Sequence, residues 1–290
     1  MTRRGALLFA TMCVVWGIPY LMIRVAVREL TPDTLVFLRT GLAALLLVPL
    51  AVRRDELRPL LARWRPLLAY TAIEVALPWV LLARAETKLT SSLTGLLLAA
   101  VPLFSALILS LHGARDRLGG RLWIGLLVGL AGVAAIVGLD LGHVNVVALI
   151  EIALVALCYA VGPIILSRHL SGSPPLGVVA ASLALTAIVY APFAAAHWPS
   201  RLPSAHVVES VVGLAVVCSA AAFLLFFALI AEVGPLRATV ITYVNPAVAA
   251  VLGVVLLNER LTAGMLIGFA LVLLGCVLAT GRSPEAVPEP

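Results

Sequence analysis

The chain has 290 residues, of which 62% are hydrophobic and only 12% are charged, and its mean hydropathy is +1.13. An average soluble domain is about half apolar and about a quarter charged, so this composition excludes a water-soluble globule and a disordered chain. Long unbroken apolar runs favour membrane helices over the alternating strands of a membrane barrel. The net charge is +6, and the basic residues responsible for it lie in short loops beside these runs. This placement indicates a role in orienting the protein in a membrane and not nucleic-acid binding.

The apolar runs define the predicted elements. A bilayer core about 30 Å thick requires about 20 apolar residues per helix. In chain order, the ten predicted spans are residues 5–27, 34–52, 66–84, 89–111, 121–139, 144–167, 175–194, 207–230, 236–257 and 261–280. Residues 282–290 are polar and Pro-rich and are predicted to form a disordered tail. The predicted fold class is an all-α polytopic membrane protein of ten transmembrane helices.

The basic residues predict how these spans are oriented. The N-terminal Arg3 and Arg4 precede an apolar run that is too long for a signal peptide, so we predict a retained first span. With the N-terminus inside, thirteen Arg residues fall in inner segments and five Arg or Lys residues in outer segments. This distribution predicts that both termini are cytoplasmic.

The two halves of the sequence resemble each other. Gly125 and Gly132 match Gly268 and Gly275, and the members of each pair are 143 residues apart. Two further matches follow the same register, Trp16 with Tyr159 and Asp116-Arg117-Leu118 with Glu259-Arg260-Leu261, and Pro102 aligns with Pro246, 144 residues on.

These matches predict two copies of a unit of about 143 residues, 1–143 and 144–281. Each unit contains five predicted spans, and because five is odd, the second copy crosses the membrane in the opposite direction. Such inverted five-helix repeats are common in secondary transporters, which bind substrate near the midplane where the repeats meet.

Several of these residues also form a family pattern. The pattern comprises Trp16-Gly17, Leu38-Arg39, Pro102 with Asp116-Arg117-Leu118 and Gly125, and then Asn245-Pro246, Glu259-Arg260-Leu261 and Gly268. It resembles the EamA-type ten-helix exporters of the drug/metabolite transporter superfamily. Asp116 departs from the Glu that is more frequent there, and Arg24 from a Lys or polar residue. The resemblance implies export of small metabolites, often amino acids or related compounds, across a bacterial inner membrane.

Glu74 is the first candidate for the substrate pathway. It lies about eight residues, or roughly 12 Å, into the third span, which places a carboxyl group near the midplane. Ionisable groups at this depth are costly and are usually functional or paired. Glu74 would bind a cationic group or carry a coupling proton; the alternative is a structural partner for a neighbouring arginine.

Two arginines flank the first outer turn at a similar depth. Arg24 and Arg39 would cup a carboxylate or phosphate with their guanidinium groups. The alternative is that both extend to the outer interface. Glu151, about a turn and a half inside the sixth span, is either functional or simply reaches outer water.

Aromatic residues supply the remaining candidates. Trp16, Tyr20 and Arg24 are spaced i, i+4, i+8 and would line one helix face toward a cavity. Tyr159 occupies the position in the second half that matches Trp16. Weaker pathway candidates are Trp79, Tyr243 and Asn245.

Prolines and glycines predict bending and close packing. Pro102 and Pro246 recur in both halves and are predicted hinges, with fixed curvature as the alternative. Gly125-x3-Gly129 and Gly264-x3-Gly268 allow helices to pack closely and leave a homodimer possible.

Other classes of protein lack sequence support. No phosphate-binding GxxxxGK[ST] loop, HExxH or GxSxG motif is present, and the four cysteines form no CxxC pair. We therefore predict no catalytic residue, no metal and no cofactor, and partners limited to a small-molecule substrate and the bilayer. The primary prediction is a secondary transporter that works by alternating access. An intramembrane enzyme acting on lipid-linked substrates and a non-transporting scaffold are the alternatives.

Overall fold

The computed structural model describes residues 2–111, 120–138, 145–238 and 240–280, and every regular element in these ranges is a helix. Seven segments are long and apolar enough to cross a membrane, and three shorter apolar helices cover residues 122–137, 241–257 and 263–279. Together they match the ten predicted spans and confirm the predicted all-helical polytopic membrane fold. Asp116 and the tail 282–290 lie outside the described residues.

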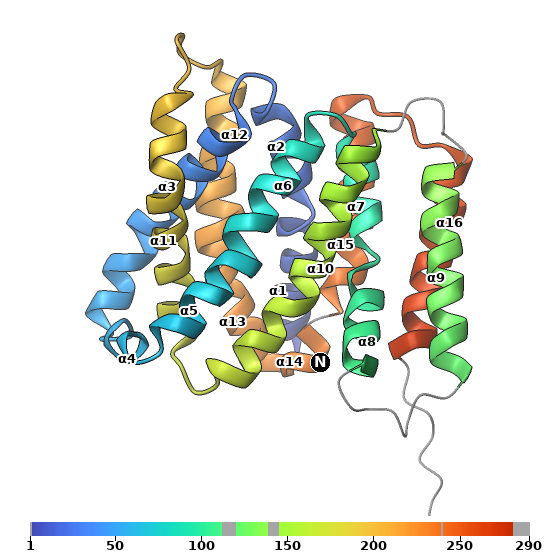
Figure 1. Ribbon diagram of the computed structural model, residues 1–290, viewed down its shortest axis with the longest axis horizontal. Coiled ribbons are helices and arrows are strands. Elements are labelled where there is room, and N and C mark those ends of the chain that lie inside the picture. The colour runs from blue at the N-terminus through green and yellow to red at the C-terminus, as the bar shows by residue number, and fades with distance from the viewer. Residues whose placement is uncertain (1, 112–119, 139–144, 239, 281–290) are drawn as a thin grey trace, which may run out of the picture.

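The helices stand side by side as a bundle (Figure 1). In chain order the elements are α1 (Arg3–Val15), α2 (Ile18–Ala26), α3 (Pro32–Arg53), α4 (Arg58–Leu61), α5 (Trp64–Tyr70), η1 (Thr71–Ala76), α6 (Leu77–Glu86), α7 (Ser91–Leu98), α8 (Val101–Leu111), α9 (Gly120–Gly138), α10 (Val146–His169), α11 (Pro175–Ala196), α12 (Ala205–Ala215), η3 (Val216–Ala221), α13 (Ala222–Val233), α14 (Pro235–Ala238), α15 (Ile241–Leu257) and α16 (Ala263–Thr280).

The first and sixth spans run in opposite directions. α1 begins at the face drawn at the bottom of Figure 1, whereas α10 and α16 both end there. The loops that join α6 to α7 and α15 to α16 lie at the opposite face (Figure 1). This antiparallel course agrees with an inverted second half, although the division at residues 143 and 144 stays a prediction.

The first span is interrupted between α1 and α2. At the interruption the N–H of Gly17 donates to Val14 O at 2.9 Å instead of to Cys13 O. The side-chain amide nitrogen of Asn245 on α15 donates to Cys13 O at 3.0 Å, with the amide oriented to satisfy its neighbours. The carbonyl released by the interruption is therefore satisfied across the interface, as buried polar groups in a membrane must be.

The fourth span is interrupted between α7 and α8. Pro102 has no N–H to donate to Leu98 O, so the regular hydrogen-bond ladder stops there. The thiol of Cys276 on α16 donates to Ala99 O at 3.5 Å. In contrast, α15 runs through Pro246 without a break.

A wider helical turn occurs in the third span of each half. η1 and η3 are π-helical segments, and the serine hydroxyl of Ser219 in η3 donates to Leu214 O, five residues back, at 2.8 Å. Single π-helical turns inside α-helices are rare and are frequently found at functional sites. Glu74 lies in the first segment, and Ser219 lies in the second.

Two closely packed helix pairs stand on either side of the bundle, α3 with α11 and α9 with α16. In the second pair, backbone touches backbone: a Cβ added at Gly125 would lie 2.5 Å from Ala279 N, and one at Gly132 would lie 2.7 Å from Gly268 O. The close packing predicted for Gly125 and Gly268 is thus confirmed within the chain. A homodimer stays a prediction.

Candidate functional site

Arg39 is the central charged residue of the bundle. It lies in the buried face of α3 with 7% of its surface exposed. Its Nε donates to the hydroxyl oxygen of Ser219 in η3 at 3.0 Å. The guanidinium therefore joins the two halves of the chain inside the bundle.

Trp79 on α6 supports the same guanidinium from one side. The Arg39 Cζ atom lies 3.7 Å from the centre of the Trp79 ring, which is a cation–π contact. Trp79 is itself buried, so the pair is held inside the bundle. The Ser219 bond and the Trp79 ring together fix the orientation of the Arg39 side chain.

Two tyrosines extend this cluster. Tyr20 on α2 and Tyr159 on α10 are both half-buried and lie within electrostatic range of Arg39. Tyr159 is also within electrostatic range of Glu74. Four predicted residues from four different spans, Tyr20, Arg39, Trp79 and Tyr159, thus lie near one another in the bundle interior, and Glu74 lies within electrostatic range of Tyr159.

Glu74 projects from η1 onto α10. The carboxyl oxygen Oε2 is buried and, among the described residues, accepts no hydrogen bond. Gly162 makes room for it, because a Cβ at this position would lie 1.8 Å from Glu74 Oε2. Pro78, four residues on, cannot donate to the Glu74 carbonyl, which is a local reason for the wider turn.

Glu86 is a buried carboxyl group that the sequence analysis missed. It is the last residue of α6, it is 0% exposed, and neither of its carboxyl oxygens meets a donor in the described part of the chain. The guanidinium of Arg24 donates to the main-chain oxygen of Glu86 and not to its carboxyl group. The predicted span ended at residue 84, so Glu86 was placed in a loop among other charged residues.

Glu259 ties the two halves together at one face. Its carboxylate accepts hydrogen bonds from the main-chain N–H groups of Ser91 and Ser92, each at 2.9 Å. The two serine hydroxyls donate to it as well, at 3.0 and 2.6 Å. The carboxylate thus satisfies N–H groups at the start of α7, where the helix dipole favours negative charge. We call this set of contacts the Glu259 clasp.

Two further carboxylates cap helices in the other half. Glu56 accepts from the N–H of Gly177 in the first turn of α11 at 3.0 Å. Glu29 accepts from the N–H and the hydroxyl of Ser204, which precedes α12, at 2.7 and 2.6 Å. These hydrogen bonds lower the pKa of Glu29 below its ordinary value.

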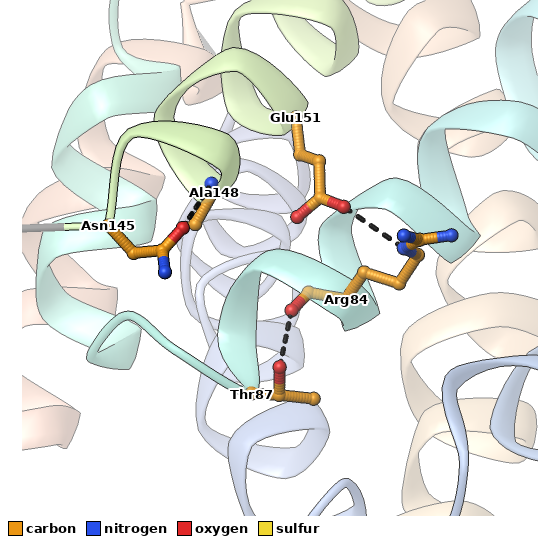
Figure 2. Close-up of polar contacts among 5 residues, drawn as sticks. All are labelled: Arg84, Thr87, Asn145, Ala148 and Glu151. Carbon is orange, nitrogen blue, oxygen red and sulfur yellow. Dashed lines mark hydrogen bonds and ion pairs between the residues drawn. The ribbon is translucent and has the colours of Figure 1, made fainter.

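Glu151 has a partner that explains its burial. Its side chain is 7% exposed, and its Oε1 lies 3.0 Å from Nε of Arg84, whose side chain is 58% exposed. Figure 2 shows this ion pair between α10 and α6 beside the Asn145 cap of α10. The sequence left a functional role or contact with outer water open for Glu151, and the structure instead pairs it with Arg84.

The remaining predicted residues lie outside the Arg39 cluster. Trp16 packs against Phe226 and Phe223 of α13, with ring centres 4.7 and 6.0 Å away. Trp16 packs in the apolar cluster around Met12 and Leu229, whereas Tyr20 packs against the main core, and the helix is interrupted between them. Tyr243 packs at the edge of the main apolar core.

Metal binding finds no support in the described residues, where no group of three or more His, Cys, Asp or Glu side chains is placed to hold an ion. The site therefore consists of one fixed guanidinium, aromatic rings, hydroxyls and carboxyl groups. Such a set can bind and orient a small solute.

Comparison with known proteins places this chain in a family. A model of the EamA-like transporter family matches the chain twice, over residues 3–138 and 146–281. An uncharacterized inner membrane transporter of Escherichia coli (strain K12), YedA, is 30% identical over 277 residues, with 92% of this chain and 87% of that protein covered. An uncharacterized transporter of Bacillus subtilis (strain 168), YvbV, is 24% identical over 292 residues, with 97% and 92% covered.

One solved crystal structure shares the fold, with a TM-score of 0.66, 21% identity and 97% of each chain covered. The twofold match accounts for nearly the whole described chain. The chain is a multi-pass membrane protein that belongs to the EamA-like transporter family.

Proposed function

We propose that this protein is a secondary transporter that exports small metabolites, such as amino acids or related compounds, by alternating access. The observation that carries the proposal is the Arg39 cluster, because its side chains come from both halves and meet inside the bundle. Membership of a transporter family supports transport over the alternative of an intramembrane enzyme on lipid-linked substrates.

The arrangement of the halves supports alternating access. Carboxylate caps cross between the halves at both faces: Glu259 and Glu29 at one face and Glu56 at the other. Each cap consists of hydrogen bonds that water can replace, so the polar contacts at either face can be broken and remade as that face opens and closes. We place both termini in the cytoplasm of a bacterial inner membrane, from the distribution of Arg and Lys.

Glu74 is the proposed coupling or cation-binding group. Its carboxyl lies against Gly162 at the boundary of η1 and α10, within electrostatic range of Tyr159. A Glu74→Gln variant keeps the size of the side chain and removes its charge. We expect it to flatten the pH dependence of transport more than it lowers the amount of folded protein.

Reconstituted vesicles test this function. Vesicles are loaded with a mixture of the twenty amino acids, nucleobases and short organic acids, and the solutes that leave are measured by mass spectrometry. We expect at least one solute to leave faster with the wild-type protein than with empty vesicles, and slower with Glu74→Gln. Glu209→Gln, on an exposed position of α12, is the matched control.

No accelerated solute across this mixture would refute the proposed transport. Accelerated flux with an unchanged pH profile in Glu74→Gln would refute only the role of Glu74. Intact cells then test direction, because an exporter lowers the internal concentration of its solute when it is overproduced.

A further inference from the structure

The guanidinium of Arg39 is held in place but is only partly used. Nε is bonded to Ser219, and one face of the group rests on Trp79. Its two terminal nitrogens form no hydrogen bond or ion pair with any residue that the structure describes. Each terminal nitrogen carries two N–H donors, so an oriented pair of donors points away from the groups that fix the side chain.

The buried guanidinium of Arg39 therefore has no anionic partner among the described residues. Burial of an unpaired charge is costly, and in membrane proteins such residues pair with one another or mark a substrate pathway. Glu86 lies within electrostatic range but is too far away for an ion pair, and Glu151 is already paired with Arg84. The described protein therefore does not supply the anion that Arg39 requires.

We propose that Arg39 docks a single carboxylate group of the transported solute, with the apolar part of the solute packed beside Trp79, Tyr20 and Tyr159. This inference rests on the proposed transport function and adds the chemical class of the substrate, a small organic acid anion. The two terminal nitrogens face the two carboxylate oxygens in a parallel pair of hydrogen bonds.

The way Arg39 is fixed favours a planar carboxylate over a neutral group. A guanidinium whose Nε is already occupied presents the geometry of a fork, and this fork matches two oxygens in one plane. A neutral amide offers one acceptor oxygen and one NH2 group. Its oxygen would accept from one terminal nitrogen of Arg39, but its NH2 group would face the other terminal nitrogen, and neither of those two donors would meet an acceptor. One buried cation also matches one negative charge, whereas a dianionic phosphate would bring an uncompensated charge into the bundle.

Binding of matched probe pairs tests the inference. The probes are 3-phenylpropanoate and 4-methylpentanoate, each compared with its primary amide, and titrated by calorimetry into the purified full-length chain at neutral pH. We expect each acid to bind at least about tenfold more tightly than its amide. We expect Arg39→Gln to abolish this preference and Arg39→Lys to retain part of it, because lysine keeps the charge and loses the fork.

Two further variants separate binding from folding. Ser219→Ala leaves the charge and removes the bond that orients it, so the preference for acid over amide should fall roughly threefold without disappearing. Arg168→Gln changes an exposed arginine of α10 and should leave the preference unchanged. If Arg39→Gln does not fold, the graded effects of Arg39→Lys and Ser219→Ala still decide the question.

The inference is overturned if acid and amide bind equally, if no acid binds the wild-type chain up to about 10 mM, or if phenylmethylphosphonate binds more than tenfold more tightly than the acids. Vesicle flux distinguishes this failure from failure of transport itself. Flux of neutral or cationic solutes alone would preserve the proposed transporter and reject the carboxylate. Acid binding without flux of any solute would preserve the carboxylate site and reject the proposed transport.

Discussion

The Glu259 clasp yields a prediction that depends on neither substrate nor vesicles. Glu259→Ala removes a carboxylate that accepts from four donors, two of which are the main-chain N–H groups of Ser91 and Ser92 at the start of α7. Loss of a side-chain cap costs about 0.5–2 kcal/mol, and hydrogen bonds to a charged group contribute about 1.5–3 kcal/mol each when they are buried. Glu259 is only half-buried, so in Glu259→Ala water restores much of the hydrogen-bond energy that the four donors lose.

We therefore expect the clasp to become about 2 kcal/mol easier to open in Glu259→Ala, within the range for charge-assisted caps. Because 1.4 kcal/mol is a factor of ten, this corresponds to a roughly thirtyfold faster exchange of the Ser91 and Ser92 amide protons. Hydrogen exchange followed by mass spectrometry measures it directly. Glu259→Gln should give a smaller increase, since an amide oxygen still accepts.

Internal controls make the measurement specific. The N–H of Leu93 is bonded to the hydroxyl of Thr90 at 3.2 Å and should keep its protection better than its neighbours. Amides of α9 should exchange as before, because no hydrogen bond within the described residues joins α9 to Glu259, Ser91 or Ser92. Unchanged exchange of Ser91 and Ser92 in Glu259→Ala would show that the carboxylate does not hold the start of α7 in the membrane.

Three further predictions concern packing, polar satisfaction and pH. Gly125→Val should lower the free energy of unfolding by about 1–3 kcal/mol, because a Cβ there meets the backbone of Ala279; an unchanged melting temperature in detergent would contradict this. Asn245→Ala should cost about 1 kcal/mol by removing the donor to Cys13 O, whereas Asn245→Gln in the same thermal assay tests whether any amide suffices. Hydrogen bonds lower the pKa of Glu29, so its stabilising effect is present above the ordinary value of 4.5 and is lost as the pH falls through the lowered pKa. Melting curves of wild type and Glu29→Gln should therefore converge at acidic pH, and a constant difference would refute the role of the charge.

The number and order of the spans were predictable because apolar length is set by the bilayer and is visible in sequence. Their interiors were less predictable. The interruption at Trp16-Gly17 carries a signal, since a glycine followed by Pro19 weakens the helix, but the alignment of Trp16 with Tyr20 assumed a continuous helix. As a result, Trp16 was grouped with residues from which the structure separates it.

The candidate site was only partly visible in the sequence for a different reason. Charged residues deep in apolar runs stand out, so Arg39 and Glu74 were identified. Ser219 was missed because a serine in a membrane helix is common and gains meaning only when it meets Arg39 from the other half. Glu86 was missed because nearby charged residues suggested a loop. Contacts between distant segments are set by packing, which local composition does not encode.

The two π-helical segments have a consequence for the register of their spans. An α-helix turns about 100° per residue, so each wide turn shifts every later side chain around the axis by the equivalent of an inserted residue. In an uninterrupted α-helix Glu74 and Trp79, five residues apart, would lie about 140° apart around the axis, and the wide turn of η1 brings them closer to one face. A regular α-helical turn in place of η1, with no residue removed, would rotate Trp79 about 100° around the axis and off the guanidinium, although the helix would stay apolar and long enough to span a membrane. Such a protein would insert normally and lose its central contact.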